Sequence, residues 1–150
     1  MIRFITTAET LAIRSEILRN GELLPEQCRF EGDDEPGAFH LGYFQSGLLV
    51  SIASFHNQPH PDYGPDGFQL RGMATLTEFQ GKGIGKQIIQ FAMIYLQQQG
   101  AAYVWCNARK VAYNFYLALQ FSFISGEFEI KGIGLHRKML RKIDKQNPTI

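Results

Sequence analysis

The chain has 150 residues, of which 45% are hydrophobic and 19% are charged, and its formal net charge is +1. This length and composition fit one globular domain, residues 1–150, that is long enough to bury a core. A charge so close to neutral argues against nucleic acid as a partner, because binding to a phosphate backbone needs a basic surface.

The cysteines and the hydropathy of the chain indicate which kinds of site and location to expect. Cys28 and Cys106 lie far apart and outside any Cys-x-x-Cys pair, so the sequence supports no zinc or other metal site, and no disulfide can be inferred. No apolar run approaches the roughly 20 residues of a membrane span, and residues 1–5 are too short for a signal peptide. We therefore expect a cytoplasmic protein with reduced thiols and no membrane partner.

The chain begins with a predicted strand and helix. Residues 2–5 are a short strand candidate, and a helical pattern begins at Thr7. Thr6 and Glu9 have the spacing of a capping box at the helix start, and Asn20-Gly21 stops the pattern.

A loop and a hairpin are predicted next. The acidic, proline-containing segment 22–37 is expected to be a loop. Its acidic residues are interpreted as a solvated turn rather than as metal ligands: Asp33, Asp34 and Glu35. Strands are predicted over 39–44 and 48–55, and the separator 45–47 is a hairpin signal.

A long loop, a strand and a helix follow. Residues 56–67 hold three prolines and two glycines and predict a loop in which His56 and His60 are solvated. Residues 68–75 are interpreted as a strand. An amphipathic helix then runs to about Gln99, where Gly100 ends it.

The last third predicts a strand, a helix and two more strands, over residues 103–106, 111–119, 121–128 and 135–140, with a break at 132–134. The element order is then β-α-β-β-β-α-β-α-β-β. This order predicts a mixed α/β domain around a central sheet.

Three glycines in five positions open the long helix, in the segment Gln80-Gly81-Lys82-Gly83-Ile84-Gly85. Glycine lets a backbone approach a ligand closely, and amide N–H groups at a helix start attract phosphate. A P-loop is excluded, because no Gly-Lys-Ser or Gly-Lys-Thr stands at the required distance. A dinucleotide fingerprint is not favoured, because the glycine spacing differs and Cys106 or Asn107 stands where an acid is needed.

The glycine segment does fit another pattern: glutamine or arginine, two residues, glycine, one residue, glycine, between a strand and a long helix. A separate motif downstream, A-x-x-(L/F)-Y-x-x-x-G-F, fits Ala112, Phe115, Tyr116 and Phe121. Together the two motifs resemble those of the GNAT N-acetyltransferase superfamily, over residues 68–128. The element order also resembles that superfamily's.

The chain departs from the family pattern at three places. Thr77 replaces a common proline before the loop, and Gln120 replaces the usual glycine before Phe121. Arg109 stands where many members have an asparagine, and Asn107 lies two residues earlier. Which of Asn107 and Arg109, if either, contacts the cofactor is open.

The resemblance implies the GNAT-like fold and an enzyme that moves an acetyl group from acetyl-CoA, as cosubstrate, to a primary amine. Direct attack in a ternary complex is expected, since neither cysteine stands in a motif for an acyl-enzyme. The resemblance also implies the residues that bind the cofactor: Met73, Thr75, Gln80, Gly81, Lys82, Gly83, Ile84, Gly85, Lys86 and Asn107.

Catalytic and acceptor-side candidates follow from the same resemblance. Tyr116 is the candidate general acid, because a phenol with a pKa near ~10 is protonated at neutral pH. His136, near the last strand, is the candidate base or acceptor-orienting group, although a water chain without a dedicated base is an alternative. Arg71 and His40 are acceptor-side candidates; for Arg71 a structural ion pair is the other interpretation.

Two other functional classes stay open at this point. One is a non-catalytic module of the same fold that binds acyl-CoA as a sensor or regulatory subunit, and the other is a nucleotide-binding α/β protein. The acceptor is a small-molecule amine, a peptide N-terminus or a lysine side chain. Homodimers are common in the family.

Overall fold

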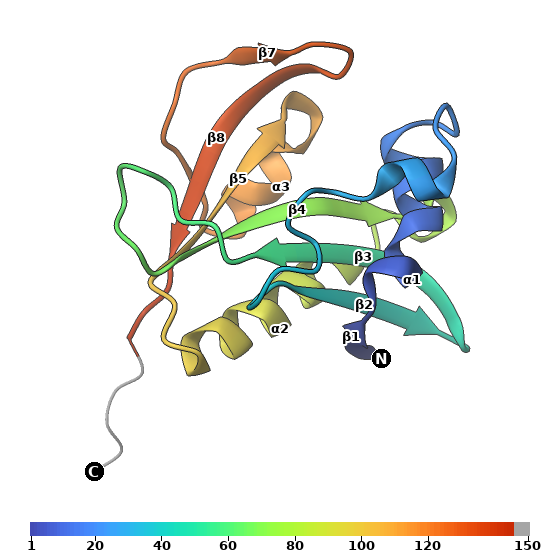
Figure 1. Ribbon diagram of the computed structural model, residues 1–150, viewed down its shortest axis with the longest axis horizontal. Helices are drawn as coiled ribbons and strands as arrows, with labels where there is room; N and C mark the ends of the chain where they lie inside the picture. The colour runs from blue at the N-terminus through green and yellow to red at the C-terminus, as the bar shows by residue number, and fades with distance from the viewer. Residues whose placement is uncertain (146–150) are drawn as a thin grey trace. The chain divides into compact units, whose positions relative to one another are not determined.

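The computed structural model describes residues 1–145 of the chain (Figure 1). Its strands are β1 (Ile2–Ile5), β2 (Phe39–Gln45), β3 (Leu48–His56), β4 (Gly67–Thr75), β5 (Tyr103–Arg109), β6 (Ser122–Phe123), β7 (Phe128–Ile130) and β8 (Gly134–Lys142). They pair in the order β1-β2-β3-β4-β5-β8-β6, and β7 pairs with β8. The pair β4–β5 is parallel, whereas β1–β2, β2–β3, β5–β8, β6–β8 and β7–β8 are antiparallel. This mixed sheet with few helices confirms the predicted fold class.

The elements follow the expected order with one addition. In chain order they are β1, α1 (Thr7–Ile13), β2, β3, β4, α2 (Ile84–Gln98), β5, α3 (Tyr113–Ala118), β6, β7 and β8. Short 3-10 turns lie at Pro25–Cys28, Thr77–Phe79 and Lys110–Ala112, and α1 continues as a π-helical turn over Arg14–Leu18.

The chain divides into two compact units. The first comprises Met1–Asn57 and Leu70–Tyr95, and the second comprises Gln58–Gln69 and the described residues from Leu96 onward. Both β4 and α2 have residues in each unit. One domain over residues 1–150 stays a prediction.

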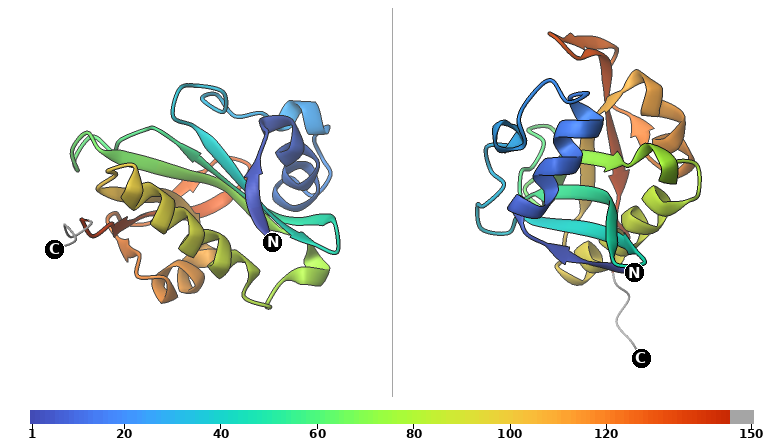
Figure 2. Two further views of the ribbon diagram at one scale, coloured as in Figure 1. Left: turned by 90° about the horizontal axis from the view of Figure 1, so that it is seen from below. Right: turned by 90° about the vertical axis from the view of Figure 1, so that its right-hand side faces the viewer.

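In the first unit, neighbouring residues of β1 face different helices because side chains alternate along a strand. Phe4 packs edge-on against Tyr95 of α2, with ring centroids 5.0 Å apart. Ile5, the next residue, joins a buried cluster with Ile13 at the end of α1 and Ile52 of β3. Helices α1 and α2 therefore cover opposite faces of these strands (Figure 2).

Local signals set the ends of α1. The Glu9 amide donates to Thr6 Oγ1 at 3.2 Å and the Thr6 amide donates to Glu9 Oε1 at 3.0 Å, so the predicted capping box is confirmed. Asn20 and Gly21, with φ of 52° and 73°, turn the chain out of the helical conformation, as predicted. The hairpin expected at 45–47 is confirmed, with Gln45 paired to Leu48 and a two-residue turn at Ser46 and Gly47, both of which have positive φ.

In the second unit, the loop before β4 is fixed by aromatic side chains of β5. The Tyr103 hydroxyl donates to Gly64 O at 2.7 Å and accepts from the His60 amide at 2.8 Å. Trp105 Nε1 donates to Gln58 O at 2.9 Å. The prediction that His60 is solvated is wrong: its side chain is buried, and its ring packs edge-on against Trp105.

One strand prediction is also wrong. Residues 121–128 form not one strand but the two short strands β6 and β7, both paired with β8. Ser125 lies between them and is held in place by β8, because its Oγ accepts from the Lys138 amide at 2.8 Å. The hairpin of β7 and β8 is at the top of Figure 1.

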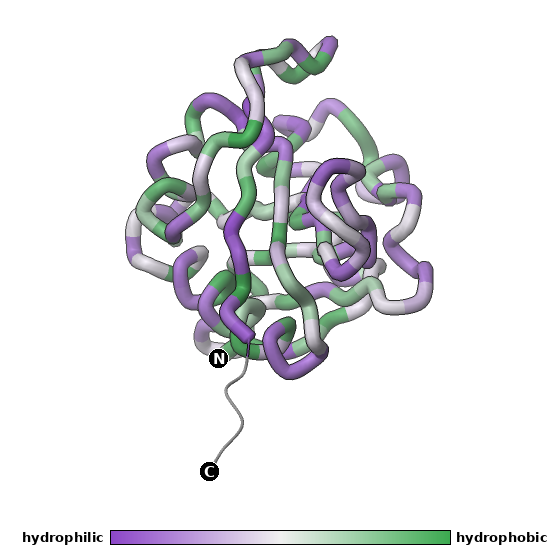
Figure 3. The backbone as a smooth tube through the Cα atoms, turned by 90° about the vertical axis from the view of Figure 1, so that its left-hand side faces the viewer, coloured by the Kyte–Doolittle hydropathy of each residue, from purple (hydrophilic) through white to green (hydrophobic). Residues whose placement is uncertain are grey.

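No helix within residues 1–145 is both long and apolar enough to cross a membrane. Figure 3 shows hydrophobic and hydrophilic residues interspersed along the chain. The hydrophobic ones collect in the core positions of both units.

Candidate functional site

The glycine segment forms an exposed loop between β4 and α2 in the first unit. Gly81 and Gly83 have φ of 75° and 79°, a conformation that other residues adopt only under strain. A Cβ built on either glycine meets no atom within 4 Å, so the space beside the loop is open. Gln80 fixes the loop to the strand, because its Nε2 donates to Thr75 O at 2.9 Å.

The start of α2 offers unpaired amides. The Gln87 amide donates to Gly83 O at 3.1 Å, which makes Gly83 the residue at the N-cap. The amides of Ile84, Gly85 and Lys86 therefore precede the first bond of the helix and have no partner within it. No acidic residue lies in the first turn. Open amides, a helix dipole and nearby lysines suit an anionic group, and these are the residues that the sequence assigned to the cofactor.

The end of β4 next to the loop is irregular. Gly72 has a φ of 64°, which interrupts regular strand geometry just before Met73. Thr75 Oγ1 lies 2.7 Å from Ser51 Oγ of β3. Met73 and Thr75 are both partly exposed, so the strand segment expected to contact the cofactor is accessible.

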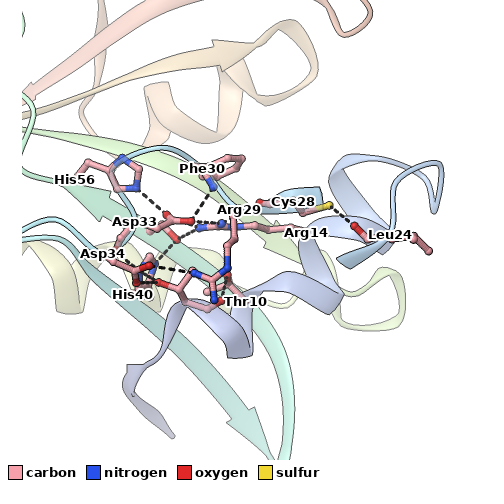
Figure 4. A network of polar contacts seen from close by, with 12 residues as sticks. Thr10, Arg14, Leu24, Cys28, Arg29, Phe30, Asp33, Asp34, His40 and His56 are labelled. Atoms are coloured by element: carbon pink, nitrogen blue, oxygen red, sulfur yellow. Dashed lines mark hydrogen bonds and ion pairs between the residues drawn. The ribbon is translucent and has the colours of Figure 1, made fainter. Parts of the chain in front are cut away.

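A buried polar network occupies the α1 face of the first unit (Figure 4). Arg14, with a side chain 1% exposed, binds Asp33 through two bonds of 2.7 and 3.0 Å. Asp33 also accepts from the Phe30 amide at 2.8 Å. The prediction that Asp33 belongs to a solvated turn is therefore wrong. Burial alone raises the pKa of Asp33, but the bonds from His56, Arg14 and Phe30 outweigh burial and hold it far below its usual range.

His40 is held on both sides of its ring in this network. Its Nε2 lies 3.1 Å from the Asp33 carbonyl, which only accepts, so Nε2 carries the proton. Its Nδ1 then accepts from Ser54 Oγ at 2.7 Å, and Ser54 Oγ accepts from Arg14 Nη2 at 2.7 Å. Burial lowers the pKa of His40, so the ring is neutral at pH 7. Both nitrogens are occupied by protein groups.

His56 is the last residue of β3, and the prediction that it is solvated is wrong. Its side chain is buried, and its Nε2 donates to Asp33 Oδ1 at 2.9 Å. The alternation Ile52, Ser54, His56 continues the strand period and places the ring on the α1 face. If this alternation is continued one residue beyond the expected strand end at 55, it predicts that His56 is buried.

Arg14 was missed as well, although its signal is in the sequence. It stands three residues after Leu11, on the stripe of α1 that faces the core. A charged residue on such a stripe requires a buried partner, and the acidic run at 33–35 supplies it through Asp33.

Arg71 lies in the middle of β4. Its guanidinium stacks over the Phe30 ring, 4.2 Å from the centroid, and Arg14 lies over the same ring at 3.9 Å. Burial lowers the pKa of Arg71, the charge of Asp33 raises it and the charge of Arg14 lowers it. Among residues 1–145 no carboxylate forms an ion pair with Arg71 and no group accepts a hydrogen bond from it.

In the second unit, Tyr116 of α3 is buried at 6% exposure between Phe115 and Phe121. Burial and, to a lesser extent, Cys106 raise the pKa of Tyr116 well above its ordinary value. No group within residues 1–145 forms a hydrogen bond with its hydroxyl. Burial also raises the pKa of the Cys106 thiol, so Cys106 is an unreactive thiol.

The other candidates of the second unit lie along the β5–β8 pair. Asn107 faces Lys138, whose Nζ donates to Asn107 Oδ1 at 3.0 Å, and Arg109 faces His136. His136 is buried, and its Nδ1 lies 2.8 Å from the Gly134 carbonyl, which only accepts, so Nδ1 carries a proton. The register thus places Asn107, Arg109, Lys138 and His136 on one face of the β5–β8 pair.

Comparison with known proteins gives one family. The model of the acetyltransferase (GNAT) family matches residues 7–121. The chain is 37% identical over 143 residues to the uncharacterized N-acetyltransferase YitI of Bacillus subtilis (strain 168), and the match covers 95% of each protein.

Solved structures share the fold at low identity. An aminoglycoside 6'-N-acetyltransferase complexed with coenzyme A matches with a TM-score of 0.76 and 13% identity over 99% of both chains. The ribosomal-protein-S18-alanine N-acetyltransferase of Escherichia coli matches with a TM-score of 0.75 and 15% identity, over 100% of this chain and 97% of that one.

Proposed function

The chain belongs to the GNAT acetyltransferase family, and from this premise we propose that it moves an acetyl group from acetyl-CoA to a primary amine by direct attack in a ternary complex. The observation that carries the proposal is the open glycine loop with its uncapped helix start. The similar aminoglycoside acetyltransferase that was solved with coenzyme A supports the choice of donor.

The loop and the strand end supply the donor contacts in this proposal. The amides from Gly81 to Lys86 hold the pyrophosphate, with charge added by Lys82 or Lys86. Backbone N–H groups near Met73 and Thr75 bind the pantetheine arm and polarise the acetyl carbonyl. Asn107 is a further contact to acetyl-CoA. Its amide oxygen accepts from Lys138, so its amide NH₂ group is the part that faces the cofactor in this proposal.

Tyr116 acts as the acid for the leaving thiolate. An ordinary tyrosine loses its proton in the same pH range in which a primary amine becomes neutral, near ~10. Because the pKa of Tyr116 is raised, its hydroxyl stays protonated while the amine becomes reactive. With no protein partner among residues 1–145, the hydroxyl is available to the thiolate.

Two histidines are the candidates on the acceptor side. His136 orients the acceptor or takes its proton through Nε2. His40 supports the network around Asp33 rather than touching the acceptor, because both its nitrogens are occupied. The acceptor itself is a small molecule or a peptide amine.

The test measures thiol release with acetyl-CoA and a panel of amines, beside the Kd of coenzyme A. Tyr116→Phe should lower kcat about 100-fold or more and change the coenzyme Kd less than about twofold. Tyr113→Phe is the matched control, since Tyr113 lies on the same helix and its hydroxyl bonds to Glu127 at 3.2 Å. Tight coenzyme binding without turnover of any amine would instead favour a binding module.

A further inference from the structure

Asp33, the carboxylate whose charge acts on Arg71, has no free acceptor position. A carboxylate offers about four lone-pair positions to donors. Asp33 uses all of them: Oδ1 accepts from Arg14 at 3.0 Å and His56 at 2.9 Å, and Oδ2 accepts from Arg14 at 2.7 Å and the Phe30 amide at 2.8 Å. Asp33 therefore has no position left for Arg71.

The neighbouring carboxylate is engaged elsewhere. Asp34 accepts from Thr7 Oγ1 at 2.7 Å and pairs with Arg29 at 3.0 Å. Two guanidinium groups thus lie over the Phe30 ring, those of Arg14 and Arg71. Asp33, the carboxylate that bonds to the Phe30 amide, is neutralised by Arg14. The remaining charge is the positive charge of Arg71.

Arg71 also lies on an anchored ring. Its guanidinium carbon is 4.2 Å from the Phe30 centroid, and Phe30 in turn is held by the hydrogen bond from its amide to Asp33 and by Arg14 at 3.9 Å. The planar fork of N–H groups on a guanidinium suits a carboxylate or a phosphate. A partly buried cation with its donors unused is stabilised when a ligand supplies the acceptors.

The position of Arg71 relates it to the acetyl group. Arg71 directly precedes Gly72 and Met73, the strand segment to which the proposed function assigns the acetyl carbonyl. A Cβ on Gly72 would lie 2.9 Å from Phe30 Cε2, so the Phe30 ring that contacts Arg71 also contacts this strand segment. The pyrophosphate, by contrast, is assigned to the loop that begins nine residues later.

We propose that Arg71 binds an acidic group of the acceptor, so that the acceptor is an amine with a carboxylate or phosphate close to its nitrogen. This inference rests on the proposed acetyl transfer. It selects one of the two interpretations of Arg71, the ligand anchor, because no ion pair with Arg71 forms among residues 1–145.

The test uses two pairs of amines that differ in the acidic group: β-alanine with β-alaninamide, and O-phosphoethanolamine with ethanolamine. The wild-type protein should use the acidic member of at least one pair with a kcat/KM about tenfold or more above its neutral partner. Which pair shows the preference distinguishes carboxylate from phosphate. In Arg71→Gln the acidic member should fall to the level of the neutral one, which itself should not change.

Arg3→Gln is the matched control. Arg3 also stacks on a phenylalanine, 4.1 Å from the Phe44 centroid, but lies on β1. This variant should keep the preference. Arg71→Lys keeps the charge without the fork and should give an intermediate preference, which also covers the case in which Arg71→Gln does not fold.

A second measurement is independent of turnover. The four amines are titrated calorimetrically into the protein saturated with coenzyme A. The acidic member should bind about tenfold more weakly to Arg71→Gln than to wild type, with the coenzyme Kd unchanged. Equal binding of acidic and neutral amines by wild type overturns the inference, and so does a weaker coenzyme Kd in Arg71→Gln. Absence of thiol release with every amine refutes the proposed function, and the titration then still decides the role of Arg71.

Discussion

Gly67 and Tyr103 face each other across the parallel pair of β4 and β5, and a methyl group on Gly67 would lie 2.1 Å from Tyr103 Cζ. The tyrosine ring thus lies where a side chain of residue 67 would be. The same ring carries the hydroxyl that fixes the loop before β4 through His60 and Gly64. Glycine at 67 is required by packing, since its φ is not in the left-handed region.

Gly67→Ala should therefore destabilise the protein strongly. The ring of Tyr103 must move, which leaves the His60 amide or the Gly64 carbonyl unpaired at about 1–3 kcal/mol each. We expect a loss of at least about 2 kcal/mol, seen as a fall in Tm of roughly 4–8 °C. Gly126→Ala is the control: a Cβ there meets nothing within 4 Å and φ is not positive, so Tm should change by less than about 1 °C. A similar Tm for both variants would contradict the packing argument.

Gln120→Gly should stabilise the protein. Gln120 has a φ of 70° after α3, at the position where the family pattern has glycine. A residue with a Cβ is strained in this conformation by about 1 kcal/mol, so its replacement should raise Tm by roughly 2–4 °C. Gln120→Ala retains the Cβ and should not show the gain. An unchanged Tm in the glycine variant would mean that the turn is not strained.

Gly83→Ala should weaken coenzyme binding. A Cβ at residue 83 projects into the open space beside the loop, where the proposed pyrophosphate contacts lie. We expect the Kd of coenzyme A to rise about tenfold or more. Gly47→Ala separates this effect from backbone strain, because Gly47 has a φ of 80° and open surroundings but lies in the β2–β3 turn. Both variants should lose similar stability, and only Gly83→Ala should lose affinity.

The free energy of unfolding should fall as the pH drops below about 6.5. Burial lowers the folded-state pKa of His40 from its ordinary value of 6.5, so the unfolded chain binds a proton that the folded chain excludes. The stability from neutral His40 is complete above the unfolded pKa and is lost as the pH falls toward the folded one. Urea denaturation at pH 7.5, 6.5 and 5.5 measures the slope, and His40→Gln should flatten it. An equal slope in this variant would assign the pH dependence to another group.

Local sequence signals predict the helices and turns of this fold, whereas the buried polar network around Asp33 was not predicted. Capping residues, the Ser46-Gly47 turn and the glycines at helix ends act within a few residues of sequence, so their spacing predicts them. The pairing of Arg14 with Asp33 joins residues 19 apart and depends on burial, which is a property of the folded chain. The partner of His56, Asp33, lies 23 residues away, so the prolines and glycines that follow His56 favoured a solvated loop over the strand period that indicates its burial.

The glycine at the start of α2 has a consequence for how fast the protein is degraded in the cell. Because Gly83 has no side chain to bond the free amides, the coenzyme completes the first turn of the helix in the proposed function. A ligand that binds only the folded state stabilises it by about 2.7 kcal/mol at 100 times its Kd. The fraction of chains open to proteases is then tied to the supply of acetyl donor, so that the enzyme persists where its donor is abundant.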